Sequence, residues 1–75
     1  MANDETAPRL SELLKDARAA VEHIEEARKH YAAGNQQAAV DVVALTPYKL
    51  NQALGDIDEL LKYWSGRGIV PGAGD

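Results

Sequence analysis

Cysteine and phenylalanine are absent from this chain, and other aromatic residues are few. Without Cys, neither a disulfide nor a thiolate zinc site can stabilise the fold. Without Phe, and with one Trp and three Tyr, the core has to be built mainly from Leu, Ile, Val and Ala. A single core in so short a chain rarely contributes more than about 3 to 5 kcal/mol. We therefore expect its stability to depend on regular helix packing and on association with another chain.

An excess of positive charge and a long hydrophobic run are also missing. The net charge is -4 and the sequence pI is about 5.0, whereas nucleic-acid binders neutralise phosphates with clustered Lys and Arg. No stretch approaches the roughly 18 apolar residues that a membrane span requires, and MANDETAPRL has no basic segment followed by an apolar run. We expect a soluble cytoplasmic protein that binds neither nucleic acid nor membrane.

No catalytic signature stands out in the sequence. Nothing resembles an activated nucleophile, a phosphate-binding loop or a carboxylate pair in an apolar pocket. We therefore expect no enzymatic activity and no cofactor.

The first helix is predicted over residues 9–33. Pro8 suits the first turn of a helix, and Gly34 followed by Asn35 suits a left-handed C-terminal residue and the cap of a second helix. Between them the apolar residues recur at i, i+3, i+4 and i+7, the pattern of an amphipathic helix. They are Leu10, Leu13, Leu14, Ala17, Ala20, Val21, Ile24, Ala27 and Tyr31.

The second segment, residues 36–45, is apolar nearly all round. Its valines would also suit a strand, but no second strand is predicted for it to pair with, so we predict a helix. A short helix without a polar side has to be covered on several sides. We expect a second copy of the chain to supply part of this cover, and so predict a homodimer.

Thr46 and Pro47 leave two alternatives open. Thr46 caps a separate third helix that begins at Pro47, or Pro47 kinks one long helix over 36–64. The restriction on a residue before proline favours the break. We therefore predict an all-α bundle of three helices over 8–64, between a disordered N-terminus (1–7) and a flexible Gly-rich tail (65–75).

The third predicted helix, over 47–64, also has an apolar stripe, which we expect to pack against the stripe of the first helix. It consists of Leu50, Ala53, Leu54, Ile57, Leu60, Leu61 and Trp64.

The stretch EHIEEARKHY (22–31) is the one place that suggests metal chemistry. His23 and His30 lie two helical turns apart, about 10 Å, and cannot easily share one ion. Only Glu26 and His30 have the i, i+4 separation, which provides two ligands where a structural zinc site needs four. We expect a solvated helix surface with no metal, and Glu26 and His30 remain weak metal-ligand candidates.

The segment ARKHYAAGNQQAAVDVV (27–43) resembles the interior of a tetratricopeptide repeat, in which a helix ends at Gly and Ala packs in the next helix. The sequence contains no second copy of it. The resemblance implies a tight αα-hairpin, and it assigns no peptide-binding residues.

We expect the function to be that of a small acidic protein-interaction module, an adaptor or a regulator or inhibitor that binds a larger protein. Aromatic residues and Arg are enriched at binding hot spots. The predicted partner-binding residues are Tyr48, Tyr63, Trp64, Arg67, Ile69 and Val70. The alternative is a protein that binds or sequesters a small acidic ligand between subunits, through Arg67, Tyr63, Lys49 and His30.

Overall fold

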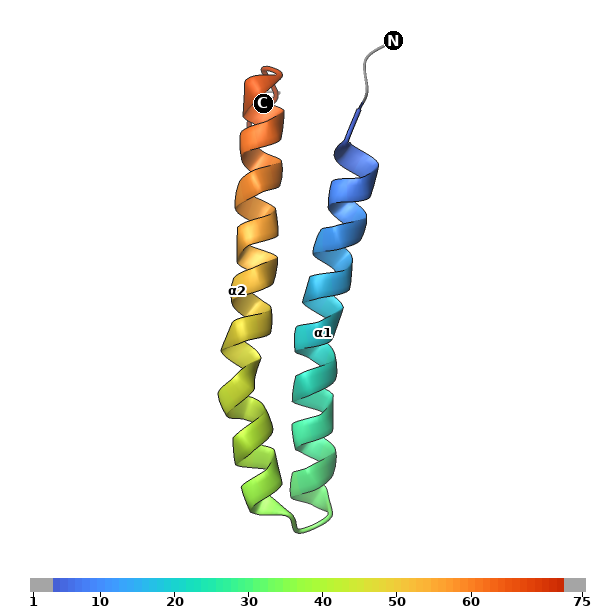
Figure 1. Ribbon diagram of the computed structural model, residues 1–75, viewed down its shortest axis with the longest axis vertical. Coiled ribbons are helices and arrows are strands. Elements are labelled where there is room, and N and C mark those ends of the chain that lie inside the picture. The colour runs from blue at the N-terminus through green and yellow to red at the C-terminus, as the bar shows by residue number, and fades with distance from the viewer. Residues whose placement is uncertain (1–3, 73–75) are drawn as a thin grey trace.

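Two long antiparallel helices joined by a short turn make up the protein in a computed structural model that describes residues 4–72 (Figure 1). Helix α1 spans Thr6–Ala32 and helix α2 spans Gln36–Gly66. The first and last described residues lie at the same end of the hairpin, called here the open end, opposite the turn end (Figure 1). The predicted all-α class is confirmed, but the prediction of three helices is wrong.

The turn between the helices uses the residues that the sequence indicated. Gly34 has φ +83°, a left-handed conformation that other residues rarely adopt. The Gly34 N–H donates to the Tyr31 carbonyl (3.0 Å) and the Asn35 N–H to the His30 carbonyl (2.8 Å), so the turn is a Schellman motif. The Asn35 side chain then accepts a hydrogen bond from the Ala38 N–H (3.2 Å) and caps α2. The implied tight αα-hairpin is confirmed.

Helix α2 runs without a break through Pro47, and this overturns the predicted third helix. Pro47 has no N–H to donate to the Val43 carbonyl, which costs a helix interior about 3 kcal/mol. Packing offsets this cost, because Ala39 and Ala53 on either side of the proline are both buried against α1. Ala39 and Ala53 both face α1 only if the helix is continuous between them. Thr46 is buried on the same side of α2, and its hydroxyl donates to the Val42 carbonyl within the helix (3.1 Å).

Both helices extend beyond their predicted bounds at the open end. α1 begins at Thr6, inside the segment predicted to be disordered, and the Thr6 N–H donates to Asp4 Oδ1 (2.8 Å). α2 continues to Gly66, two residues into the predicted tail. A second Schellman motif stops it, since Gly68 has φ +80° and the Ile69 N–H donates to the Trp64 carbonyl (2.9 Å). Of the two predicted terminal segments, residues 1–3 and 73–75 lie outside the described residues.

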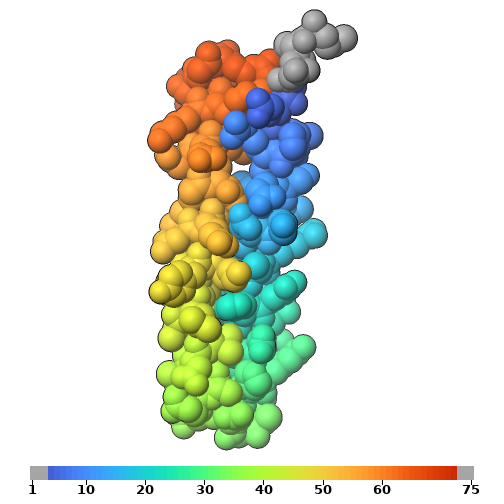
Figure 2. Space-filling model, viewed as in Figure 1, coloured from blue at the N-terminus to red at the C-terminus, as the bar shows by residue number. Residues whose placement is uncertain are grey.

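The core is a narrow line of small buried residues between the two helices, called here the seam. The two helices lie side by side in Figure 2. Members of the seam recur every seven residues. The buried ones are Ala20 and Ala27 on α1 and Ala39, Thr46, Ala53 and Leu60 on α2. Most of them are Ala, so the helices approach closely but bury little apolar area. The predicted packing of the two apolar stripes against each other is found for their small residues and for Leu60, whereas most of their larger side chains are exposed.

Candidate functional site

Large apolar side chains lie in the open on one side of the seam. On α1 and on α2 they recur with gaps that alternate between three and four residues, the a and d spacing of a coiled coil. We call this surface the apolar face. It consists of the exposed residues Leu10, Leu14, Val21, Ile24 and Tyr31 on α1, and Val40, Val43, Leu50, Leu54, Ile57 and Leu61 on α2, together with the half-buried Ala17 at the same spacing on α1. Three residues interrupt the spacing: Arg28, Gln36 and Pro47.

These side chains are far more exposed than a helix core allows. Val21 and Ile24 are 52% and 53% exposed, and Leu54 is 60% exposed. Successive residues are about 100° apart around a helix axis. The a and d positions of each helix therefore lie about a quarter of a turn around the axis from its seam positions. Since the helices are antiparallel and share the seam, their a and d positions come to the same side of the hairpin. The result is one broad face with residues from both helices.

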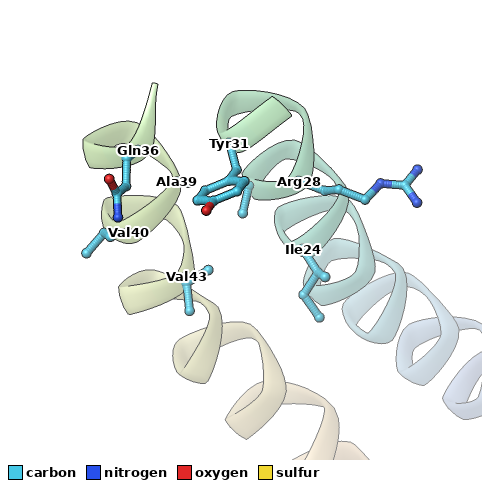
Figure 3. Close-up of a pocket in the computed structure, with 8 residues that line it drawn as sticks. Ile24, Arg28, Tyr31, Gln36, Ala39, Val40 and Val43 are labelled. Carbon is cyan, nitrogen blue, oxygen red and sulfur yellow. The ribbon is translucent and has the colours of Figure 1, made fainter. Parts of the chain in front are cut away.

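A groove at the turn end gives direct evidence of this placement, because residues of both helices line it (Figure 3). Its volume is about 500 Å³. The lining residues are Ile24, Ala27, Arg28, Tyr31, Gln36, Ala39, Val40 and Val43. The small seam residues Ala27 and Ala39 leave the groove hollow. Figure 3 shows the Tyr31 ring reaching toward α2, while Arg28 directs its guanidinium away from α2.

The hairpin exposes more surface than a compact protein of its mass. Its accessible surface is 5762 Å², whereas a folded monomer of 8.1 kDa typically exposes about 4,500 Å². The radius of gyration is 16.9 Å, against about 11 Å for a compact domain of this length. The excess of about 1,300 Å² is more than the roughly 800 Å² that a standard interface removes from one partner and is in the range of obligate homodimers.

The opposite side of the seam is polar, and we call it the polar face. It consists of the half-buried residues Arg9, Asp16, His23 and His30 on α1, and Lys49, Asp56 and Tyr63 on α2, together with one valine, Val42. Arg9 stacks on the Tyr63 ring (4.8 Å to its centre) and lies 4.0 Å from a Glu59 carboxylate oxygen. Contacts between the helices on this face are therefore made by charged and polar groups within the chain.

Asp56 is the one strongly perturbed acid on the polar face. The carboxyl group of Asp16 on α1 faces it, and a hydrogen bond between the two raises the pKa of Asp56 to about 6. Shielding from solvent and the charges of Asp16, Glu12 and Glu59 act in the same direction. Two carboxylates so placed share a proton more readily than they carry two charges.

A cluster at the open end ties the ends of the two helices together. The Trp64 Nε1–H donates to Thr6 Oγ1 (3.1 Å), and the Glu5 N–H donates to the Tyr63 hydroxyl (2.8 Å). Arg67 donates to the same hydroxyl (2.7 Å) and lies 3.5 Å from Asp4 Oδ1. The pKa of Asp4 is lowered mainly by the hydrogen bonds from Thr6, and the charge of Arg67 lowers it further.

The predicted partner-binding residues divide between this cluster and the surface. Tyr63, Trp64 and Arg67 are brought together, but by contacts within the chain. Tyr48 is 70% exposed on the outer side of α2, and Ile69 and Val70 are exposed after its end. None of the six belongs to the apolar face as defined above.

The alternative ligand site is not assembled within one chain. Arg67 and Tyr63 contact each other at the open end, whereas His30 is near the turn and Lys49 lies between them along the hairpin. The metal candidates His30 and Glu26 do meet, at 3.4 Å between Nε2 and Oε1. Within residues 4–72, however, no three His, Asp or Glu side chains come together as a metal site.

The apolar face could have been recognised in the sequence by its spacing. The sequence pattern predicts an apolar stripe on each segment but does not distinguish its buried residues from its exposed ones. The small residues recur every seven positions, whereas the large ones recur at alternating intervals of three and four. These two spacings distinguish the seam from the apolar face.

No protein-family model, no curated protein and no solved structure matches this chain. In the part of the chain that the structure describes, neither helix has the length and apolar character needed to cross a membrane.

Proposed function

We propose that this chain is a protein-interaction module that binds α-helices through the apolar face, and that it acts as an adaptor or regulator without catalytic activity of its own. The observation that carries the proposal is the a and d spacing of exposed apolar residues on two adjacent helices. Helices that present such a stripe bind other helices by inserting side chains between those of the partner. Continuous exposed apolar patches of this kind mark interaction sites.

The residue types fit a binding surface better than an aqueous one. Val21 and Ile24 on α1, and Leu54 and Ile57 on α2, are each separated by three residues, the a to d spacing of a coiled coil. A scattered exposed Leu needs no explanation, but a stripe that continues over most of two long helices does.

A photo-reactive amino acid placed on each side of α2 tests the proposal in the native host. At Leu54, on the apolar face, we expect cross-links to a helix of a partner or of another copy. At Leu45, which is 53% exposed on the outer side of α2, we expect few. Equal cross-linking at the two positions would overturn the proposal.

A second candidate function rests on the groove at the turn end. Its volume of about 500 Å³ lies in the range of ligand pockets, about 300 to 1,000 Å³, and Arg28 and Gln36 offer polar groups at its rim. A ligand present at 100 times its Kd would stabilise the fold by about 2.7 kcal/mol. A thermal-shift screen of small acidic metabolites checks this, with Arg28→Ala as the variant expected to lose the shift.

A further inference from the structure

We propose that the occupant of the apolar face is a second copy of this chain, packed face to face with the first and with the two turns at opposite ends. The proposal rests on the proposed function, because it uses the same face and names its partner. Three independent features of the hairpin support it: the surface area, the shape of the face and the charges at its border.

The area exceeds that of a standard interface and is in the range of obligate homodimers, which lose more than about 1,000 Å² per partner. One partner in a stable complex typically loses about 800 Å² of accessible surface. The hairpin exposes about 1,300 Å² more than a compact chain of its mass, so covering the apolar face would bring it to the ordinary value. A small chain without disulfides gains its missing core most simply in this way.

Two-fold symmetry lets the face cover itself. A two-fold axis that crosses the helices at right angles places α1 against α1 of the partner and α2 against α2 of the partner. Every helix then runs antiparallel to its neighbours, as in four-helix bundles with short loops. The contact closes with two copies and leaves no apolar face exposed.

The shape of the face favours opposite turns. At the turn end the floor of the groove is made by Ala27 and Ala39, and it is hollow. At the open end the seam positions carry Leu13 and Leu60, and Leu61 stands beside them on the face. With the turns at opposite ends, the bulky end of each copy meets the hollow of the other. With the turns together, two hollows would face each other, and protein interiors do not leave such voids.

The charges at the border of the face favour the same arrangement. Arg18 and Glu25 each follow a d position on α1, on either side of Val21. When α1 packs antiparallel to α1 of the partner with its centre near Val21, Arg18 of one copy meets Glu25 of the partner subunit. Both copies form this pair, so the match occurs twice.

The arrangement with both turns together loses this match. It places α1 against α2 of the partner, in the same register as within the chain. That register is set by the contacts of Thr6 with Trp64 and of Arg9 with Glu59. Arg18 would then lie level with Asn51 and Glu25 level with Ala44, which carry no charge.

Sedimentation and a single spin label test the proposal together on the full chain. We expect a species of twice 8.1 kDa that dissociates on dilution. The chain has no Cys, so Ala33→Cys carries the only label, next to the turn. With the turns at opposite ends we expect a distance of about 35 Å between the two labels, because about 11 residues of α1 at about 1.5 Å each separate the turn from the two-fold axis.

A charge exchange provides the matched control. Arg18→Glu should raise the dimer Kd about 3- to 10-fold, since it breaks two partly exposed ion pairs. The double variant Arg18→Glu, Glu25→Arg should restore the original Kd. Lys15→Glu, the same charge change on the outer side of α1, should leave it unchanged.

The outcomes separate this proposal from the proposed function. A dimer with labels under about 20 Å apart, or no rescue by the double variant, overturns the opposite-turn arrangement. A monomer at all concentrations overturns the second copy as occupant. In that case, cross-linking at Leu54 but not at Leu45 would still support the helix-binding function. Absence of cross-linking at Leu54 would overturn the helix-binding function as well as the dimer.

Discussion

The two long faces of the hairpin differ in how far a single chain can satisfy them. On the polar face, Arg9 contacts Tyr63 and Glu59, and the Asp16 carboxyl faces Asp56, all within one molecule. On the apolar face, side chains such as Val21 and Leu54 remain half exposed or more. Several polar residues thus find partners between the two helices, although Arg9 Nε, His23 Nδ1 and Asp56 Oδ2 are buried without a hydrogen-bond partner among the described residues. The large apolar residues need a further layer. The hairpin is a complete secondary structure with an incomplete core.

The largest effect is expected from a charge placed in the middle of the apolar face. Leu54→Glu should raise the dimer Kd more than about 100-fold, because an unpaired carboxylate buried in the interface costs about 3 kcal/mol or more. Sedimentation equilibrium measures the Kd. Gln52→Glu adds the same charge on the outer side of α2 and should leave the Kd within a factor of about two. A Leu54→Glu dimer of normal affinity would contradict the assignment of the face.

A substitution in the seam should affect both faces at once, with a smaller cost. Ala53 is 7% exposed, and Ala53→Leu would push the helices apart or force strained rotamers. Overpacking of this kind costs about 1 to 3 kcal/mol, which urea unfolding measures. Gln52→Leu adds a similar side chain in the open and serves as its control. Equal stability of the two variants would show that the helices are not in close contact at the seam.

The polar face predicts an unusual dependence of stability on pH. The pKa of Asp56 is raised from 3.8 to about 6 in the folded protein, so between these values the folded state holds a proton that the unfolded state has lost. The contribution of Asp56 to stability is then fully present below about pH 4 and is lost as the pH rises through about 6. We expect the thermal unfolding midpoint to decrease as the pH is raised from 4.5 to 7. Asp56→Asn should make this decrease smaller. A wild-type midpoint that rises over this interval would contradict it.

The smallest effect is expected outside both faces. Leu45 is as exposed as the residues of the apolar face, at 53%, but it lies on the outer side of α2. Leu45→Glu should change the free energy of unfolding by less than about 0.5 kcal/mol, and the dimer Kd should not move. A large loss of stability or of dimer would show that the interface extends around α2.

The fold was predictable from local residues wherever local chemistry decides it. Gly34 and Asn35 indicated the turn, and the apolar periodicity indicated helices on both sides. The break expected at Pro47 was wrong, because the local cost of a proline is smaller than the packing of Ala39 and Ala53 against α1. That packing depends on residues far away in the chain, and a single-residue rule does not include it.

The candidate site was predictable only in part. The association with a second copy and the binding of a larger protein stay predictions, and they now have a defined surface. The six predicted binding residues are of types found at interfaces, but residue type does not indicate that Trp64 donates to Thr6 or that Arg67 donates to Tyr63. Which side of a long apolar stripe faces inward depends on the size of its residues, since only the small ones fit between closely packed helices.

Pro47 also divides the main-chain hydrogen-bond ladder of α2, since it cannot donate to the carbonyl four residues before it. The part before it, from Gln36, continues from the turn, and the part after it is held by the cluster at the open end. Native-state amide hydrogen exchange should therefore resolve α2 into two units that open with different free energies. The half that carries Leu54 and Ile57 would exchange more slowly as the concentration of the second copy rises.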